Sequence, residues 1–148
     1  MSRRIREGLK CKAEPGGIAG SIRNFWRNDL MRHLQEEERI IFPLLGKDDD
    51  HVQQALYEHR RIRALISILS ADSITDLEDT LHDFAMLLES HIRFEERVLF
   101  PHIEREVPFS MLAAAHSKLQ KESPKHSGSP DTVCDKEHSS APFAACGL

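Results

Sequence analysis

The chain has 148 residues, the size of a single domain, and 40 % of them are hydrophobic, which is enough for a buried core. Its apolar runs are only a few residues long, so the sequence predicts no membrane span. A net charge of −4 gives no electrostatic case for nucleic acid as a partner. The basic N-terminus lacks the apolar stretch of a signal peptide, and three scattered cysteines argue against a disulfide scaffold, so we expect a cytoplasmic protein.

The composition divides the chain into two parts. Residues 1–122 carry nearly all of the large apolar side chains and are predicted to form one helical domain. Residues 123–148 are rich in Ser, Pro, Ala and His. Such a segment cannot bury enough surface to offset the entropy lost on ordering, so we expect a disordered tail.

Helical periodicity runs through the first part, with prolines and glycines between the helices. The expected helices cover residues 2–11, 18–41, 48–69 and 73–100, with a short fifth helix after residue 108. Pro15-Gly16-Gly17 follows the first helix, and Pro43 and Pro101 are expected to end the second and fourth. The acidic run at residues 48–50 is a good cap for the third helix.

The apolar residues of the longer helices recur in steps of three and four, which is typical of bundle helices with one buried face. Short loops between them favour antiparallel neighbours. The predicted fold class is therefore all-α, an up-down-up-down four-helix bundle whose first helix is short.

Polar residues interrupt these apolar stripes in three helices. The second carries His33 and Glu37, the fourth carries His91 and Glu95, and the third carries His59. Residues four apart share one helix face, so each His–Glu pair can reach a single ion. Because a buried carboxylate needs a partner, and no Lys or Arg accompanies these residues on the stripes, the pattern predicts a bound metal cation.

An internal repeat strengthens this prediction. Residues 33–43 read HLQEEERIIFP and residues 91–101 read HIRFEERVLFP, with six of eleven positions identical. Both copies occupy the end of a long helix, and the two helices run the same way in an antiparallel bundle. Their His and Glu residues therefore lie at one level, and the position of His59 in the intervening helix places it at that level too.

The doubled motif resembles the hemerythrin-like family of His-His-Glu cation-binding bundles, over about residues 2–107. The resemblance implies two iron ions joined by an oxo or hydroxo bridge, with dioxygen or nitric oxide as a small ligand. His33 and His91 would be terminal ligands, Glu37 and Glu95 bridging carboxylates, and His59 the ligand from the third helix. Family members bind or sense these gases, handle iron or help repair iron centres.

Two features depart from the family pattern. No histidine precedes His33, so we expect the first helix to be truncated. Either the true start lies upstream and carries the missing ligand, or the protein lacks that ligand. Oxygen carriers of the family have two histidines on the third helix, four residues apart, whereas Ala55 and Arg63 flank His59 here. A sensing, iron-handling or repair role is therefore favoured over oxygen carriage.

The metal itself stays open between three ions. Imidazole and carboxylate without thiolate suit iron, manganese or zinc. Two iron ions are favoured because the repeat supplies two equivalent halves, while one ion held by two histidines and a carboxylate is the alternative.

Other polar residues receive ordinary structural interpretations. Glu36, Glu38, Glu96 and the arginines at positions 60, 61 and 63 are expected to be solvated surface charge. For Glu36 and Glu38 the alternative is a role in supporting the metal ligands. The remaining histidines are expected to be structural or exposed, and the pair Cys134 and His138 in the tail to be fortuitous.

Three functional classes remain. The first is a metal-binding protein acting through small ligands or iron, with no catalytic residue assigned. The second is a redox enzyme or repair factor on the same site, and turnover of nitric oxide or peroxide would separate the two. The third is a metal-free helical interaction module, for which an exposed apolar groove and a homodimer are expected.

Overall fold

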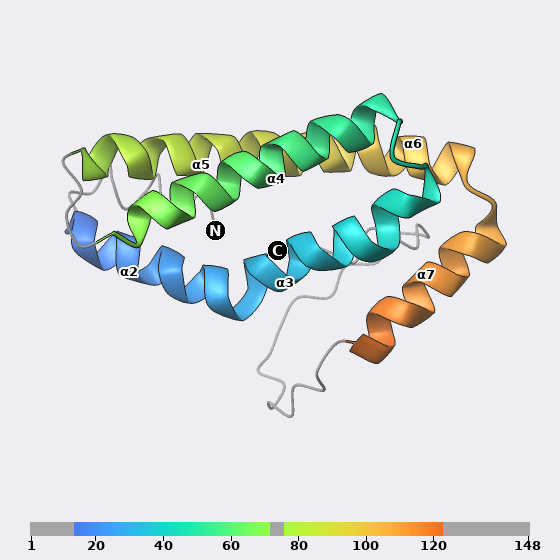
Figure 1. Cartoon of the computed structure of the whole chain (residues 1–148), viewed down its shortest axis with the longest axis horizontal. Helices are drawn as coiled ribbons and strands as arrows, with labels where there is room; N and C mark the ends of the chain where they lie inside the picture. Colours follow the sequence, from blue (N-terminus) through green and yellow to red (C-terminus); the bar gives the residue numbers. More distant parts are fainter. Residues whose placement is uncertain (1–13, 72–75, 123–148) are drawn as a thin grey trace, which may run out of the picture.

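The computed structural model describes residues 14–71 and 76–122, and within these ranges it contains helices and turns but no strand. They form three long helical rods and one shorter helix (Figure 1). The first rod consists of α2 (Pro15–Phe25), η1 (Trp26–Leu30), α3 (Met31–Glu36), η2 (Glu37–Ile41) and η3 (Phe42–Leu44). The second rod is α4 (Asp50–Leu69). The third rod consists of α5 (Leu77–Phe94), η4 (Glu95–Leu99) and α6 (Phe100–Glu106), and α7 (Phe109–Glu122) follows it.

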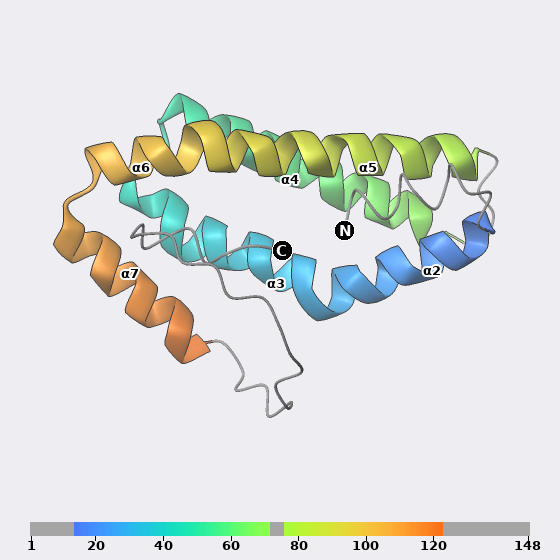
Figure 2. The same cartoon turned by 180° about the vertical axis from the view of Figure 1, so that it is seen from behind.

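The rods alternate in direction. The first and third run the same way, and the second, which follows the first in the chain, runs the opposite way, as Figures 1 and 2 show from two sides. The predicted all-helical bundle is confirmed, and α7 is the expected short helix after Pro108. The helix expected over residues 2–11 and the tail expected over residues 123–148 lie outside the described residues.

The start of α4 has the cap that the acidic run predicts. Oδ1 of Asp49 accepts hydrogen bonds from the backbone N–H groups of His51 (2.9 Å) and Val52 (3.1 Å), two of the donors that a helix start leaves free. Its other oxygen lies 2.9 Å from Nε2 of His102 on α6. Asp49 thus begins the second rod and ties it to the third.

Two apolar clusters fill the interior on either side of one polar level, the layer that contains Glu37, His59, His91 and Glu95. Leu34, Ile62 and Leu88 belong to the cluster formed by α2, η1, α3, α4 and α5. Val52 and Leu99 belong to the cluster formed by η2, η3, the start of α4, the end of α5, η4, α6 and α7. On each rod the predicted His and Glu residues fall between members of the two clusters, so apolar side chains enclose that level from both ends.

The second expected helix ends where the sequence predicted, because η2 stops at Ile41 and only the three-residue turn η3 contains Pro43. The prediction for Pro101 is wrong, because the helix continues past it as α6 to Glu106. In each rod a π-helical segment precedes the proline, so the proline stands in the first turn of a new segment, where its missing N–H costs little. The wider π turn also shifts the buried face. The steps of three and four of a regular α-helix would continue the buried face from Glu95 to Val98, but Val98 is 39 % exposed and Leu99 is buried instead.

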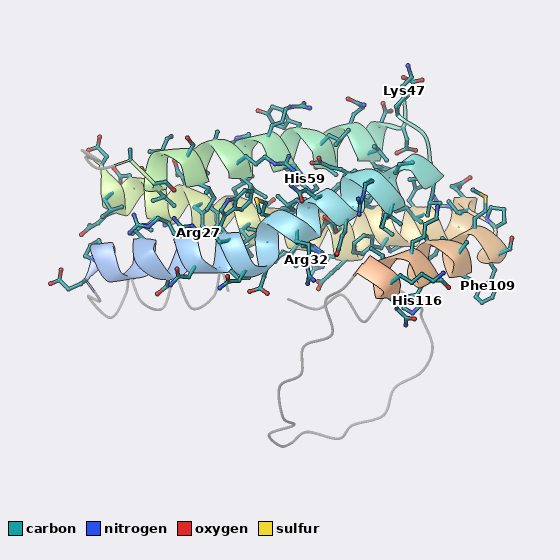
Figure 3. The ribbon with its side chains drawn as sticks, turned by 60° about the horizontal axis from the view of Figure 1, so that its bottom comes forward. Arg27, Arg32, Lys47, His59, Phe109 and His116 are labelled. Atoms are coloured by element: carbon teal, nitrogen blue, oxygen red, sulfur yellow. The ribbon has the colours of Figure 1, made fainter. Side chains whose placement is uncertain are left out.

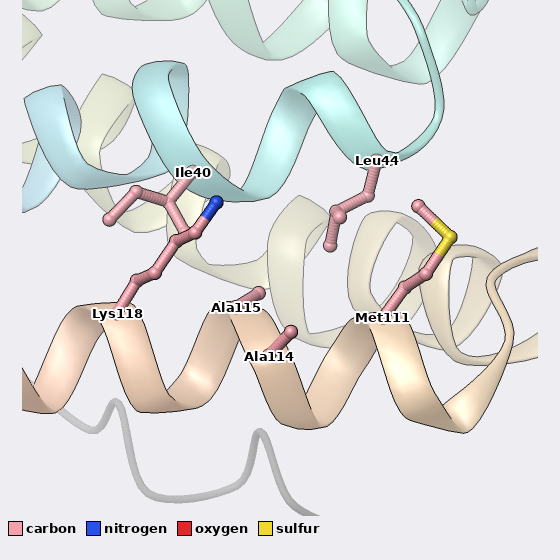
Figure 4. A pocket seen from close by; sticks show the side chains of 6 residues that line it. All are labelled: Ile40, Leu44, Met111, Ala114, Ala115 and Lys118. Atoms are coloured by element: carbon pink, nitrogen blue, oxygen red, sulfur yellow. The ribbon is translucent and has the colours of Figure 1, made fainter.

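Helix α7 packs against the end of the first rod. Leu112 and Ala115 are buried there among the residues of the second apolar cluster. A small apolar cavity of about 140 Å³ remains between η2, η3 and α7 (Figure 4). Its walls carry only one charged side chain, that of Lys118.

Candidate metal centre

The polar level brings four of the five predicted residues into one buried group. One donor atom from each of Glu37, His59, His91 and Glu95 lies within 4.8 Å of the other three. The first rod, α4 and the third rod all contribute, and none of the four residues is more than 4 % exposed. Figure 3 shows His59 in the interior between α3 and α4. The register inferred from the sequence for His59 is therefore the one observed.

The donor atoms converge closely. Nε2 of His59 lies 3.2 Å from Nε2 of His91, which in turn lies 3.1 Å from Oε1 of Glu95. Oε2 of Glu37 lies 3.4 Å from Nε2 of His59. Two imidazoles and two carboxylates thus point their donors into one small volume.

The fifth predicted residue, His33, lies at the edge of this group. Its Nε2 is 3.2 Å from Oε1 of Glu37, but its side chain is 18 % exposed, whereas that of Glu37 is 4 % exposed. His33 therefore touches the cluster through one carboxylate and also faces solvent. It is the most accessible of the five residues.

Both copies of the repeat fold in the same way. Glu37 begins the π-helical segment η2 and Glu95 begins η4, and the N–H of each glutamate lies near the carbonyls three and four residues before it. Single π turns inside α-helices are frequent at functional sites. The equivalence predicted from the two motifs therefore extends to their backbone conformation.

The carboxylate behind His59 belongs to Glu38, for which the sequence favoured surface charge over a role in supporting a ligand. Oε1 of Glu38 lies 2.7 Å from Nδ1 of His59, on the ring edge that faces away from the cluster. The same oxygen accepts a hydrogen bond of 2.8 Å from Arg63. The expectation that Glu38 and Arg63 are merely solvated charge is therefore wrong.

A second carboxylate stands behind His91. Oε2 of Glu58 lies 2.8 Å from Nδ1 of His91, and its other oxygen accepts a hydrogen bond of 3.1 Å from Gln54. Glu58 immediately precedes His59 on α4, and this adjacency was the only signal in the sequence. Partial burial opposes ionisation, but the hydrogen bonds outweigh it and lower the pKa of both Glu38 and Glu58.

The cluster binds protons strongly when it holds no metal. Burial would lower the pKa of the histidines, but neighbouring carboxylates outweigh it and raise the pKa to about 8 for His59 and about 10 for His91. For Glu95, burial is outweighed by the two histidines, and its pKa falls to about 2. Burial and the charge of Glu95 raise the pKa of Glu37. A cation entering the cluster therefore competes with protons.

The carboxylates of the cluster fit a cation. Both oxygens of Glu37 and Oε1 of Glu95 are buried and accept no well-formed hydrogen bond, although imidazole nitrogens stand within ion-pair distance. Buried carboxylate oxygens without donors are costly, and a metal ion removes that cost. Nitrogen and oxygen donors without sulfur are the ligands preferred by iron, manganese and zinc.

The other described histidines lie elsewhere. His51 and His102 stack edge to face with ring centroids 4.7 Å apart, beside Asp49. His116 lies on the outside of α7, 2.9 Å from Gln120 (Figure 3), and His82 is exposed. Each matches the expectation of a structural or exposed residue.

This is an all-α bundle whose buried group of two histidines and two glutamates could hold a metal cation. Comparison with protein families agrees. The sequence model of the hemerythrin HHE cation-binding domain matches residues 3–103 and again residues 52–122, and the chain belongs to this family. Searches of curated proteins and of solved structures gave no match. No helix among the described residues is long and apolar enough to cross a membrane.

Proposed function

We propose that this protein binds iron through Glu37, His59, His91 and Glu95, with His33 as a fifth ligand, and that the bound metal interacts with a small diatomic ligand. The observation that carries the proposal is the set of buried carboxylate oxygens without hydrogen-bond donors, placed opposite two imidazole Nε2 atoms. Family membership supports a cation as the occupant.

Charge balance favours a metal over an internal partner. The ion pairs observed at the oxygens of Glu37 and Glu95 all have a histidine as the partner. Protonation is the only alternative within the cluster, and it leaves several charged groups in a buried volume. A divalent ion neutralises both carboxylates and uses the neutral form of both histidines.

The repeat supports a dinuclear site. Each copy supplies one His and one Glu in the same geometry, on rods that run the same way. His59 stands between the two copies, since its Nε2 is near both Glu37 and Glu95. Two equivalent pairs with a shared histidine suit about two ions better than one.

Iron would supply redox chemistry and open coordination positions for dioxygen or nitric oxide. The protein's own residues would control access to it. Leu34, Phe84 and Leu88 are fully buried in the adjoining apolar cluster and exclude water from one end. The partly exposed His33 marks the side from which a small ligand can approach.

The test is an anaerobic titration of metal-free protein with Fe²⁺, followed by dioxygen or nitric oxide, with absorbance recorded throughout. Saturable binding and a new absorption band after gas addition support the proposal. Saturable binding without a response to either gas refutes the diatomic ligand. Absence of Fe²⁺ binding by folded protein refutes the metal function.

A further inference from the structure

We propose that Glu38 and Glu58 are positioning residues that hold His59 and His91 with Nε2 turned into the cluster, and that Arg63 makes the two histidines unequal as metal donors. This inference rests on the proposed metal function. It adds a support for each histidine ligand and a difference in donor strength between the two.

The first step is orientation. Each imidazole has two nitrogens, and a carboxylate beside one of them keeps the proton on that nitrogen by accepting its hydrogen bond. Nδ1 of His59 faces Glu38 at 2.7 Å, and Nδ1 of His91 faces Glu58 at 2.8 Å. Both carboxylates come from a neighbouring rod, so each hydrogen bond also locks two rods together. The lone pair of each Nε2 is thereby directed to the cluster.

The second step is the difference between the two supports. Oε1 of Glu38 lies 2.7 Å from Nδ1 of His59 and also accepts a hydrogen bond of 2.8 Å from the guanidinium of Arg63. Glu58 divides its oxygens, giving Oε2 to His91 and Oε1 to the neutral amide of Gln54. The cationic guanidinium of Arg63 uses the same oxygen of Glu38 that contacts His59. Glu38 therefore polarises His59 less than Glu58 polarises His91.

Solvent exposure acts in the same direction. The side chain of Glu38 is 29 % exposed and that of Glu58 is 12 % exposed. Water therefore screens the charge of Glu38 more strongly. His91 should therefore be the stronger metal donor and His59 the weaker one, so the two histidines would contribute unequally to metal affinity.

The chain provides a matched control. Glu96 follows Glu95 in the second copy of the repeat as Glu38 follows Glu37 in the first. Glu96 is exposed, whereas Glu38 reaches a histidine. Replacing Glu96 by glutamine removes the same charge from the equivalent position without touching a histidine of the cluster.

The experiment measures Co²⁺ binding to the metal-free full chain through its d–d absorption, with Zn²⁺ as the competitor for affinity. We expect Glu58→Gln to weaken binding by about 10–100-fold, Glu38→Gln to weaken it less, and Glu96→Gln to leave it unchanged. The Co²⁺ spectrum of Glu58→Gln should also shift, because the donor strength of His91 changes.

Arg63→Gln is the decisive variant, because the two roles that Arg63 could have predict opposite changes in Co²⁺ affinity. Release of Glu38 from the guanidinium should strengthen its hydrogen bond to His59 and tighten Co²⁺ binding. A purely structural arginine would loosen the site, and weaker binding by Arg63→Gln would overturn the inference. This variant still decides the matter if Glu58→Gln fails to fold.

The outcomes separate the inference from the function on which it rests. Wild-type protein that binds neither Co²⁺ nor Zn²⁺ refutes the metal function. Wild-type binding with Glu38→Gln and Glu58→Gln both equal to Glu96→Gln overturns the positioning roles alone. Equal losses in Glu38→Gln and Glu58→Gln overturn the inequality.

Discussion

Nε2 of His59 and Nε2 of His91 lie 3.2 Å apart, although the two residues are 32 positions apart in the chain and belong to antiparallel helices. The Nδ1 atom of each ring is already engaged by a carboxylate. Two neutral imidazoles in this arrangement would present lone pairs to each other, so a proton or a cation must lie between or beside them. The raised pKa values of both rings likewise indicate that the rings readily take up a proton.

His33 should affect the amount of bound metal more than the fold. It touches only Glu37 within the cluster and its side chain is 18 % exposed, so truncation leaves no large buried cavity. We expect His33→Ala to reduce bound iron from about two ions to about one, with unchanged helical content. The measurement is metal content by plasma mass spectrometry with circular dichroism. His82→Ala, at an exposed position of α5, is the control, and full retention of metal by His33→Ala would exclude His33 as a ligand.

The stability of metal-free protein should fall as the pH rises above neutrality. The pKa of His91 rises from 6.5 to about 10 on folding, and that of His59 to about 8, because carboxylates outweigh the effect of burial. A raised pKa stabilises fully below 6.5 and this contribution is lost as pH rises through the folded value. We therefore expect Tm in the presence of a chelator to decline between pH 6.5 and 10.

His91→Gln provides the control for this pH dependence, because it removes the larger of the two shifts. The decline in Tm should be clearly smaller in that variant. It should also be smaller in metal-loaded wild type, where the histidines are already neutral. An identical decline in wild type and His91→Gln would show that other groups cause it.

Asp49 should contribute to stability without affecting metal binding. It caps α4 through two backbone N–H groups and contacts His102. We expect Asp49→Ala to lower the free energy of unfolding by at least about 1 kcal/mol, measured by urea denaturation. The adjacent exposed residue gives a matched variant, Asp48→Ala, which should change stability by less than about 0.5 kcal/mol. Equal effects of the two variants would contradict the capping role.

The apolar cluster beside the metal level should tolerate little loss of volume. Leu88 is fully buried one turn before His91, so Leu88→Ala is expected to cost about 2–5 kcal/mol of unfolding free energy. Met86, on the same helix, is 45 % exposed, and Met86→Ala should cost less than about 0.5 kcal/mol. Denaturant titrations of both variants measure the difference, and similar losses would contradict the observed orientation of α5.

The sequence predicted most of the candidate site because its signals were periodic. The apolar stripes indicated which face of each helix is buried, and the repeat placed Glu37 and Glu95 at one level. His59 followed from its depth in an antiparallel helix, and Asp49 from the acidic run before α4. Each of these inferences needs only helix geometry and chain direction.

The contacts that the sequence did not predict depend on rotation about a helix axis and on how the rods approach one another. Glu38 and Glu58 face their histidines only because neighbouring rods approach at particular angles. The π turns at η2 and η4 each insert an extra residue that the period of a regular α-helix does not predict. That period places Val98 inside the bundle, where the structure has Leu99. Both errors arise where the site departs from regular α-helix.

Metal content per chain is the sharpest test of cation binding by Glu37 and Glu95. Wild-type protein, purified without added metal and then incubated with Fe²⁺, is compared with the double variant Glu37→Gln, Glu95→Gln. The control is Glu36→Gln, Glu96→Gln, which removes the same charges next to the cluster. We predict bound iron in wild type and control and its loss in the first variant. A folded wild type that retains no iron, manganese or zinc, or a first variant that retains as much as the control, would contradict metal binding at this cluster.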